Sequence, residues 1–486
     1  MYSNKKNFIY YIVNNIISGL VPLISLSILS RELNPEDYGL YALYLIVGST
    51  FASFINFGLP AAHEVMFFEQ KNKSLQSRLT YSSVMFVVSI SIIIFIPVFF
   101  TKDFIVDTVI YDRNTNNILY LAYWSCIISS LTIIFFNHIR NEGNGRDFLI
   151  YKSLSSIMNL ILTLYLILYQ GYNYEAFFIS TIIISSFLII FFLKKLELNL
   201  SSFSIPLIIE MVKISIPFFP KIIVGFLRTN YDRILINNIS TQSILGTYDI
   251  GLKVSNQGYT LMNSLYNSYL PDFYRILNQK PKGYKESLPN FLLKFFSVYI
   301  ISLLLLALFS FEIFQITTPE TFHEAINICS IIALTMSFYF IDHIPILLFL
   351  KKTKLISLMN VVVTITQFSF GLFFGVKFGI YGFLISNLIL SILSSFFIYN
   401  LYQRELKLKW PLRKILILYG FIFFACISII LLRIIDIEYY FRLMFKLMLV
   451  LMFISLLFKL KIFSKQEFTD LLNKAKSYFQ RVKIEK

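Results

Sequence analysis

Apolar stretches of membrane-spanning length follow one another along almost the whole 486-residue chain. A helix needs about 20 mostly apolar residues to cross the hydrocarbon core of a bilayer. The segments between the stretches are short, and none is long enough to fold as a separate soluble domain. The pattern therefore predicts an all-α integral membrane protein with about fourteen transmembrane helices, at residues 8–29, 38–59, 79–100, 118–137, 148–168, 174–193, 215–239, 246–270, 291–311, 325–350, 356–376, 380–402, 415–432 and 441–458.

The formal net charge of +16 comes from Lys and Arg residues that are concentrated in alternate loops. Basic residues crowd the N-terminus, the loop after every second span, and the C-terminal tail, whereas the opposite loops carry few of them. Cytoplasmic loops of membrane proteins hold the excess of Lys and Arg. The charge is therefore a topology signal, which places both termini in the cytoplasm, and it gives no reason to expect a nucleic-acid partner.

The two ends of the chain and its cysteines add little chemistry. Residues 8–29 are too long for a cleaved signal peptide and are expected to remain as the first span. Cys126, Cys329 and Cys426 each lie within a span, as small core residues do. The tail at 464–486 has apolar residues at helical spacing among Lys and Arg, which predicts an amphipathic helix on the inner leaflet or a solvated helix against a cytoplasmic loop.

Two halves of the chain share a pattern. Residues 38–41, Tyr-Gly-Leu-Tyr, align with residues 245–248, Leu-Gly-Thr-Tyr, at an offset of 207. Shorter matches follow in the same order, at 158–159 with 359–360 and at 174–180 with 381–386. Six spans separate each matched pair, so both copies have the same orientation in the membrane. The sequence predicts a parallel repeat of two six-helix lobes, at 1–200 and 201–403, followed by two extra spans and the tail at 404–486.

Ionisable residues gather in the spans at 215–239 and 246–270. Such residues are costly inside a membrane and usually face a cavity or a partner. In the first of these spans, three charged residues share one helical face and a fourth lies beside them; they are Lys221, Arg228, Asp232 and Arg233. In the second, polar residues recur every three or four positions: Asp249, Lys253, Asn256, Thr260, Asn263 and Asn267.

The surplus of cations over anions in these two spans indicates a site for an anion such as a diphosphate. The predicted substrate-binding residues are Lys221, Arg228, Arg233, Lys253, Asn256, Asn263 and Asn56. A purely structural alternative stays open, because Arg228 with Asp232 and Asp249 with Lys253 are spaced as i,i+4 ion pairs.

No metal-ligand cluster, phosphate-binding glycine loop or Ser-His-Asp arrangement is found, so neither catalytic residues, a metal nor a cofactor is expected. A coupled proton or sodium ion is a further possibility. Its candidate ligands are Asp232, Asp249 and Asp342, although Asp342 with His343 is equally explained as a capped polar spot ahead of Pro345.

Two segments resemble Wzx-type polysaccharide flippases. Residues 31–41, Arg-Glu-Leu-Asn-Pro-Glu-Asp-Tyr-Gly-Leu-Tyr, are similar to the first external loop of that family. Residues 230–236, Asn-Tyr-Asp-Arg-Ile-Leu-Ile, together with residues 245–248, are similar to its seventh span and the following loop. These flippases belong to the MOP superfamily, which also contains the lipid II flippases and the MATE multidrug exporters.

The resemblance implies a MATE-like arrangement of two lobes around a central cavity. It also implies alternating-access transport of undecaprenyl-diphosphate-linked oligosaccharide units, as in O-antigen or capsule synthesis, from the inner to the outer leaflet of a bacterial cytoplasmic membrane. The implied partners are this lipid-linked substrate, membrane lipids and the polysaccharide polymerase machinery. Only Asp232 and Arg233 match family motifs, whereas Lys221, Arg228 and Lys253 depend on the polar stripe alone.

Two other functions are weighed against transport of a lipid-linked sugar. An ion-coupled multidrug exporter of the same superfamily would favour cationic substrates and carry surplus acid in its site, the reverse of this chain. An oligosaccharide polymerase or ligase, which is an enzyme, needs a large external loop, and the longest here, at 101–117, is modest.

Overall fold

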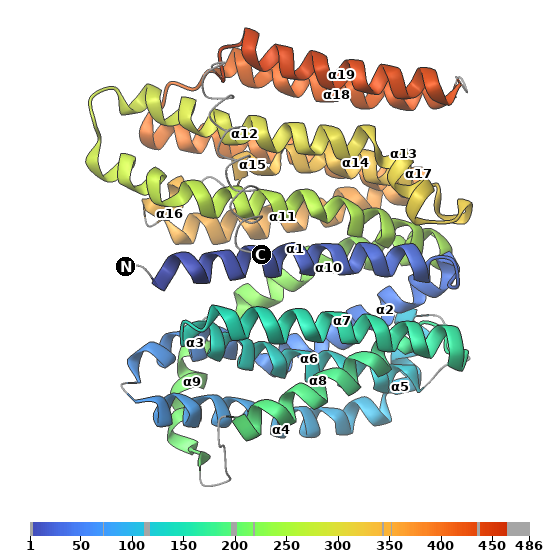
Figure 1. The fold of residues 1–486 in the computed structure, drawn as a ribbon, viewed down its shortest axis with the longest axis vertical. Coiled ribbons are helices and arrows are strands. Elements are labelled where there is room, and N and C mark those ends of the chain that lie inside the picture. The colour runs from blue at the N-terminus through green and yellow to red at the C-terminus, as the bar shows by residue number, and fades with distance from the viewer. Residues whose placement is uncertain are drawn as a thin grey trace, which may run out of the picture. The chain divides into compact units, whose positions relative to one another are not determined.

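The chain is helical throughout the part that the structure, a computed structural model, describes: residues 3–70, 72–110, 117–195, 202–216, 219–342, 345–350, 352–434 and 438–463 (Figure 1). The predicted all-α architecture is confirmed. Close packing divides the chain into two units. The first contains Met1–Ile250, Gln315–Phe322 and Gly371–Ile380, and the second contains Gly251–Phe314, His323–Phe370 and Tyr381–Lys486. The predicted lobe boundaries at 200 and 403 stay a prediction.

The first unit is built mainly from long helices joined by short turns. In it, α1 packs against α7, and α6 packs against α2, α3, α4 and α8. The elements are α1 (Ser3–Leu29), α2 (Pro35–Asn56), α3 (Leu59–Glu69), α4 (Lys73–Phe100), α5 (Lys102–Ile105), a π-helical turn η1 (Val106–Ile110), α6 (Ile118–Asn141), α7 (Gly145–Gln170), α8 (Glu175–Lys195), α9 (Ile205–Ser215), α10 (Phe219–Ile239) and the start of α11 (Gln242–Gln279).

The second unit has α12 at its centre, which contacts α14, α18 and α19. The last two helices, α18 and α19, pack side by side (Figure 1). The second unit contains most of α11. The elements that follow α11 in the chain are α12 (Tyr284–Leu308), α13 (Ser310–Thr317), the 3₁₀ turn η4 (Glu320–Phe322), α14 (Ala325–Ser337), α15 (Tyr339–Asp342), α16 (Ile346–Phe349), α17 (Thr353–Leu406), α18 (Leu412–Ile434) and α19 (Tyr439–Lys459). Of these, η4, the end of α13 and the middle of α17 belong to the first unit.

Most predicted spans appear as single helices, and three places differ. The span predicted at 215–239 begins only at Phe219, after a separate helix α9 that ends at Ser215. The span predicted at 325–350 is divided into α14, α15 and α16, and α16 begins directly after Pro345, whose missing N–H cannot continue a helix. The spans at 356–376 and 380–402 together form α17, which is interrupted at Gly379 by a non-helical φ of 62°. Glycine is the residue that adopts such a backbone angle without strain.

Ten helical segments within the described residues are long and apolar enough to cross a membrane. The number is lower than fourteen for physical reasons that the sequence contains. Helices α10 and α11 carry the charged and polar residues of the predicted site, the first span counts only as a shorter apolar helix at Ile17–Leu29, and residues 358–406 count once although Gly379 divides them. The multi-pass architecture is confirmed, and the count of fourteen stays a prediction.

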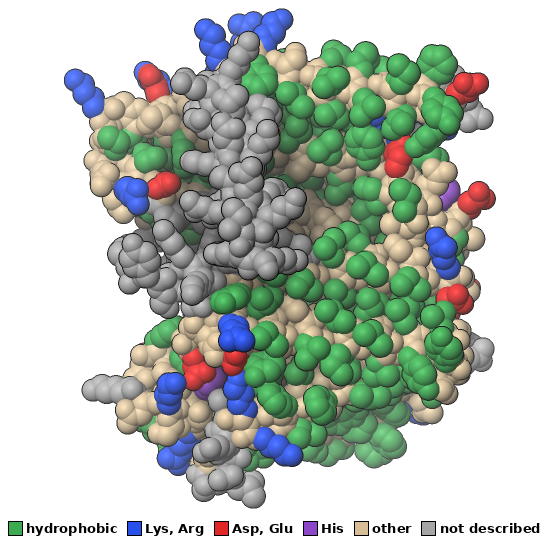
Figure 2. Space-filling view, in the orientation of Figure 1, with side chains coloured by type: hydrophobic (Ala, Val, Ile, Leu, Met, Phe, Trp, Pro, Cys, Tyr) green, Lys and Arg blue, Asp and Glu red, His purple; other side chains and the backbone are tan. Residues whose placement is uncertain are grey.

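The surface of the helices is apolar. Large side chains such as Ile93, Phe187, Phe396 and Leu451 are more than half exposed. Figure 2 shows hydrophobic side chains over most of the visible face, with charged side chains gathered toward its two edges. A soluble protein rarely exposes so much apolar area, whereas lipid tails solvate it without cost. This distribution is the one that a membrane protein requires.

A buried ion pair joins α13 to α19 in the second unit. Lys446 Nζ lies 2.7 Å and 2.8 Å from the two carboxylate oxygens of Glu312, and the Lys446 side chain is only 3 % exposed. The rings of Phe309 and Phe311 lie within 6 Å of the ammonium group. Because each charge neutralises the other away from water, the pair fixes the position of the last helix on the second unit.

The charge pattern makes a direct prediction about topology. Single cysteines at Asn34 and Glu320 should react with a membrane-impermeant thiol reagent in intact cells, in a protein that lacks the three native cysteines. Cysteines at Lys73, Lys282 and Lys407 should react only after the membrane is opened, because basic loops stay in the cytoplasm. Labelling at position 282 or 407 in intact cells would contradict the predicted orientation.

Candidate functional site

The first wall of the candidate site is α2, whose start is strongly specified by sequence. Asn34 caps the helix: its side chain accepts a hydrogen bond from the Asp37 backbone N–H at 2.9 Å, and the Asp37 carboxylate accepts one from the Asn34 N–H at 3.1 Å. Pro35 occupies the first helical position, where a missing N–H costs nothing. This reciprocal capping box fixes where α2 begins. It therefore also fixes which residues of α2 face the site.

The start of α2 meets the start of α11 at two glycines. A methyl group added at Gly39 would overlap the carbonyl oxygen of Gln242, and one added at Gly246 would overlap the carbonyl oxygen of Pro35. Pro35 and Gln242 are 207 residues apart, as are Gly39 and Gly246. The contact is thus reciprocal under the offset of the internal repeat, as at an interface with two-fold symmetry. This geometry supports the repeat independently of sequence similarity.

The turn between α10 and α11 is held against η1. The Asn237 side chain donates to the Val109 carbonyl at 2.8 Å, and the Gln242 side chain donates to the Ile110 carbonyl at 2.9 Å. A π-helical turn leaves carbonyl groups without regular helical partners, and side-chain amides satisfy two of them here. These two hydrogen bonds fix the start of α11, which carries Gly246, against η1.

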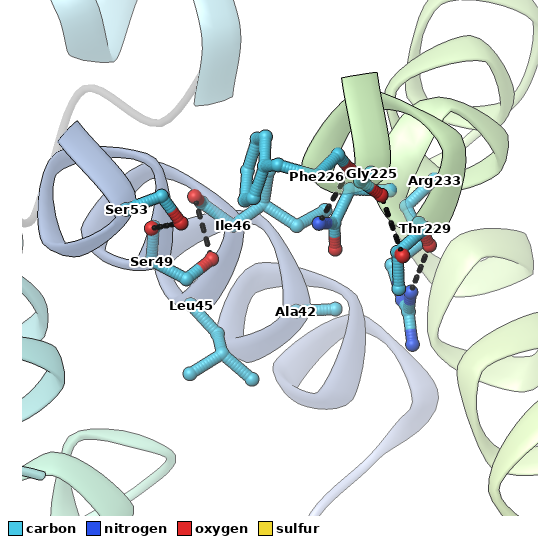
Figure 3. Close-up of a pocket in the computed structure, with 10 residues that line it drawn as sticks. Ala42, Leu45, Ile46, Ser49, Ser53, Gly225, Phe226, Thr229 and Arg233 are labelled. Carbon is cyan, nitrogen blue, oxygen red and sulfur yellow. Dashed lines mark hydrogen bonds between the residues drawn. The ribbon is translucent and has the colours of Figure 1, made fainter. Parts of the chain in front are cut away.

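A cavity of about 480 Å³ lies between α2 and α10 in the first unit (Figure 3). Helix α2 contributes Ala42, Leu45, Ile46, Ser49 and Ser53, spaced so that they share one face. Helix α10 contributes the facing residues Gly225, Phe226, Thr229, Asn230 and Arg233. The lining is largely apolar with a few polar groups, which is the usual composition of a ligand pocket.

The polar side chains of the lining donate hydrogen bonds to backbone carbonyls of their own helices. Ser53 donates to the Ser49 carbonyl at 2.8 Å, Thr229 donates to the Gly225 carbonyl at 2.8 Å, and the Asn230 amide donates to the Phe226 carbonyl at 3.1 Å (Figure 3). A hydroxyl that donates its only hydrogen still has lone pairs to accept further bonds. The serine and threonine oxygens can therefore accept hydrogen bonds from hydroxyl groups of a ligand.

Arg233 is the charged residue of the lining, and two acids hold it. Its Nε donates to Asp249 Oδ1 at 2.8 Å, and its Nη1 lies 3.9 Å from Asp232 Oδ1. The Tyr248 hydroxyl donates to the other oxygen of Asp232 at 2.6 Å. Among the described residues, Nη2 of Arg233 has no partner. The guanidinium is therefore held in place at one edge and has donors remaining for an anion.

The structure brings together only some of the predicted site residues. Arg233, Asp232 and Asp249 come together in the first unit. Asn56, at the end of α2, has a buried side-chain oxygen without a hydrogen-bond partner in the described part of the chain. Lys253, Asn256 and Asn263 follow on α11 in the second unit, where Asn256 is exposed and the other two are half-buried. The side chains of Lys221, Arg228 and Asp342 lie outside those that the structure describes.

Sequence reasoning missed the partners of Arg233. It searched for acids on the same helix, whereas Asp249 comes from the next helix, α11. It also missed Tyr248 as the partner of Asp232. Tyr248 is the last residue of the motif at 245–248 and Asp249 directly follows it, so the motif around Gly246 is the signal that could have identified them.

The solved structures that share this fold include transporters and a flippase. A lipid II flippase MurJ in an inward closed conformation matches with a TM-score of 0.64 at 16% identity, over 93% of this chain and 98% of that one. A multidrug resistance MATE family transporter of the MOP superfamily, in its inward-facing conformation, matches with a TM-score of 0.54 at 13% identity, over 82% and 95%. A Vibrio cholerae MATE transporter mutant matches with a TM-score of 0.55 at 13% identity, over 84% and 98%.

These matches define the fold class: a multi-pass helical membrane fold that the chain shares with MurJ and with a MATE transporter of the MOP superfamily. The expected MATE-like fold is confirmed. Residues 5–276 match the model of the family described as polysaccharide biosynthesis protein, and the chain belongs to that family. The expected relationship to polysaccharide flippases is thereby confirmed. No curated protein matches the chain by sequence.

Proposed function

We propose that this protein is a flippase that carries undecaprenyl-diphosphate-linked oligosaccharide units from the inner to the outer leaflet of a bacterial cytoplasmic membrane. The observation that carries the proposal is a guanidinium group held by two acids at an otherwise largely apolar pocket, in a chain of the polysaccharide biosynthesis family. A diphosphate needs fixed, charged donors, and a lipid-linked sugar needs hydroxyl acceptors beside apolar surface.

In this proposal, each part of the site has a separate role. Arg233 Nη2 donates to a phosphate oxygen, while Lys221, Arg228 and Lys253 supply further positive charge. Oxygens of Ser53 and Thr229, together with Asn56, Asn256 and Asn263, bond the sugar. Moving negative charge out of a cell that is negative inside releases about 2.3 kcal/mol per charge per 100 mV. Membrane potential thus favours export.

Coupling to a proton or sodium ion stays a proposal. Of its three candidates, Asp232 and Asp249 already contact Arg233. An ion that binds these two carboxylates must therefore compete with the guanidinium. Binding of the ion and binding of the diphosphate would then be linked. The ion would free the Arg233 guanidinium from the two carboxylates, and the same guanidinium would then bind the phosphate.

The reciprocal glycine contact supports alternating access as the mechanism. It brings together the starts of α2 and α11, which are predicted to lie at the external side. Backbones in direct contact leave no path for a sugar between them. Export requires this contact to separate, and the two-fold relation means that both helices can move away from it in the same manner.

Lipid-linked intermediates in cells test the proposal. Loss of the protein is expected to leave complete, unpolymerised units on the inner leaflet, where an added impermeant glycosidase or periodate does not reach them. Restoration of export by the wild-type gene is the control. Accumulation on the outer leaflet instead would contradict a flippase and favour a polymerase or ligase.

A multidrug exporter is the second candidate, because matched structures include multidrug resistance transporters. It predicts that cells without the protein become more sensitive to cationic drugs while their surface polysaccharide is unchanged. The opposite result, unchanged drug sensitivity with lost polysaccharide, supports the flippase.

A further inference from the structure

Two buried histidines share one threonine hydroxyl in the first unit, away from the pocket. His63 on α3 and His138 on α6 are 0 % and 1 % exposed. The Oγ1 of Thr80, on α4, lies 2.9 Å from His63 Nε2 and 2.7 Å from His138 Nδ1. Phe67 packs against both imidazole rings, with centroids 5.8 Å and 5.1 Å away. Burying an imidazole costs free energy unless its ring nitrogens have hydrogen-bond partners, so two buried imidazoles in one apolar region indicate a role for them.

The hydrogen positions follow from counting donors. Thr80 Oγ1 also lies 3.0 Å from the carbonyl oxygen of Gln76, which can only accept. A hydroxyl has a single hydrogen. All three contacts are satisfied only if the hydroxyl donates to Gln76 and both imidazoles donate to the hydroxyl oxygen. Each neutral ring then presents a bare lone pair on its other nitrogen, and those two atoms, His63 Nδ1 and His138 Nε2, are buried without a hydrogen-bond partner among the described residues.

One of these lone pairs faces a carboxylate. His138 Nε2 lies 3.7 Å from Glu142 Oε1, and the Glu142 side chain is 25 % exposed. A lone pair directed at a carboxylate is unfavourable, whereas an imidazolium N–H in the same place forms an ion pair. A proton on His138 Nε2 therefore removes an unfavourable contact. Glu142 gives that proton a route from solvent.

The other charged groups near the histidines do not take this role. On α3 and α6, Glu64 and Arg140 pair with each other at 3.1 Å and are about half exposed. Lys73 on α4 and Lys195 on α8 lie near Glu142, and Lys195 pairs with Asp147 of α7 at 2.5 Å. On α9, which packs against α3, the charged side chains of Glu210 and Lys213 are exposed. Arg78 on α4 and Glu69 on α3 are exposed too.

Helix α3 connects the histidines to the pocket. Helix α2, which lines the pocket, ends at Asn56, and α3 begins at Leu59. Between them, Phe57 and Gly58 have positive φ angles of 47° and 78°. Phe57 is a bulky residue in a left-handed conformation, which is a sparsely populated state that surrounding contacts must hold. A change in how α3 packs on His138 is therefore passed to this bend at the end of α2.

We propose that His63, Thr80, His138 and Glu142 form a proton-binding site that takes up one proton at His138 and biases the bend between α3 and the pocket-lining helix α2. His63 stays neutral, since no acceptor within the described part of the chain bonds its Nδ1. The site lies toward the predicted cytoplasmic ends of α2 and α6. It needs no bound substrate, so it can be tested whatever the protein transports.

Nuclear magnetic resonance of the purified full-length protein in nanodiscs, with ¹⁵N-labelled histidine rings, measures protonation directly. In spectra recorded from about pH 8 down to about pH 5, we expect imidazolium signals to grow in for the His138 ring, while the His63 ring stays neutral. Glu142→Gln should weaken the imidazolium signals of the His138 ring at each pH in this range, because it removes the charge that stabilises the imidazolium. His138→Gln and His63→Gln assign the signals. A His138 ring that stays neutral over this range would overturn the proposal.

Pulsed electron paramagnetic resonance tests the link to α2. Spin labels are attached to cysteines at Leu45 in α2 and at the exposed Val65 in α3, in a protein without native cysteines. The distance between the two labels changes when the angle between the helices changes. The distance distribution should change in step with the imidazolium signals of His138, and Glu142→Gln should weaken both changes together. His323→Gln is the matched control, since His323 lies in the second unit, and it should leave both changes as in wild type. Distances that do not follow the His138 titration would overturn the link; because Glu142 is a surface residue, this comparison holds even if His138→Gln does not fold.

Discussion

Arg233→Leu is expected to abolish export and to lower the amount of folded protein. The change removes the cation that holds Asp232 and Asp249, whose side chains are 11% and 3% exposed. Removing one partner of a buried ion pair costs about 3–5 kcal/mol, because a buried charge is left without compensation. Surface polysaccharide and membrane protein level are measured in the same cells.

A double variant separates binding from folding. In Arg233→Leu with Asp249→Leu, the main ion pair is replaced by apolar side chains, and protein level should recover. Export should not recover if Arg233 binds the diphosphate, since a charged hydrogen bond is worth about 1.5–3 kcal/mol, which is about 10- to 100-fold in affinity. Arg233→Lys should export poorly, because an ammonium lacks the planar fork that contacts acid and phosphate together.

Arg275→Ala is the matched control for this series. Arg275 pairs with Asp272 at 3.1 Å on the same helix, and its side chain is 65% exposed. An exposed pair of this kind contributes about 0–1 kcal/mol. Export and protein level should therefore stay at wild-type values. Full export by the Arg233→Leu, Asp249→Leu double variant would show that Arg233 serves only to pair with acids.

Gly246→Ala and Gly39→Ala are expected to have the second largest effects. In each case the added methyl group overlaps a backbone carbonyl oxygen of the facing helix, and backbone cannot move aside as a flexible side chain does. Overpacking of this kind costs about 1–3 kcal/mol. Both variants should unfold at lower temperature than wild type when purified. Both should export less, because the starts of α2 and α11 no longer close.

The reciprocal geometry predicts similar losses from the two glycines. Gly420→Ala is the control, since no atom of the described chain lies within 4 Å of a methyl group added there. That variant should be as stable as wild type or slightly more so, because alanine favours a helix by about 1 kcal/mol over glycine. Wild-type stability of both Gly39→Ala and Gly246→Ala would contradict the close contact.

Local signals determined where most helices are. Long apolar runs predicted their existence, and Asn34, Pro35 and Asp37 mark the start of α2 by capping chemistry that acts within four residues. The division of the 325–350 span was missed, because an apolar run looks the same whether a helix is continuous or broken. Pro345, after which α16 begins, was a local signal for this division, but the prediction followed hydropathy alone.

The charged residues of the site were visible in the sequence because ionisable groups are rare in apolar spans. Their pairing was not visible. Spacing along one helix suggested Asp249 with Lys253 and left Arg233 without an acid, whereas the fold brings Asp249 to 2.8 Å from Arg233. Helical periodicity gives the face on which a residue lies and carries no information about which helix is opposite.

The histidine site could not be predicted from the sequence either. His63, Thr80 and His138 are isolated polar residues in sequence, without a motif or a regular spacing that joins them. They form a network only because α3, α4 and α6 pack together. The sequence by itself determined the membrane, the helices and the family, since these depend on composition and local order, whereas the repeat stays a prediction. Tertiary structure alone decided which buried charges and imidazoles meet, because such contacts join residues that are distant along the chain and are selected by packing.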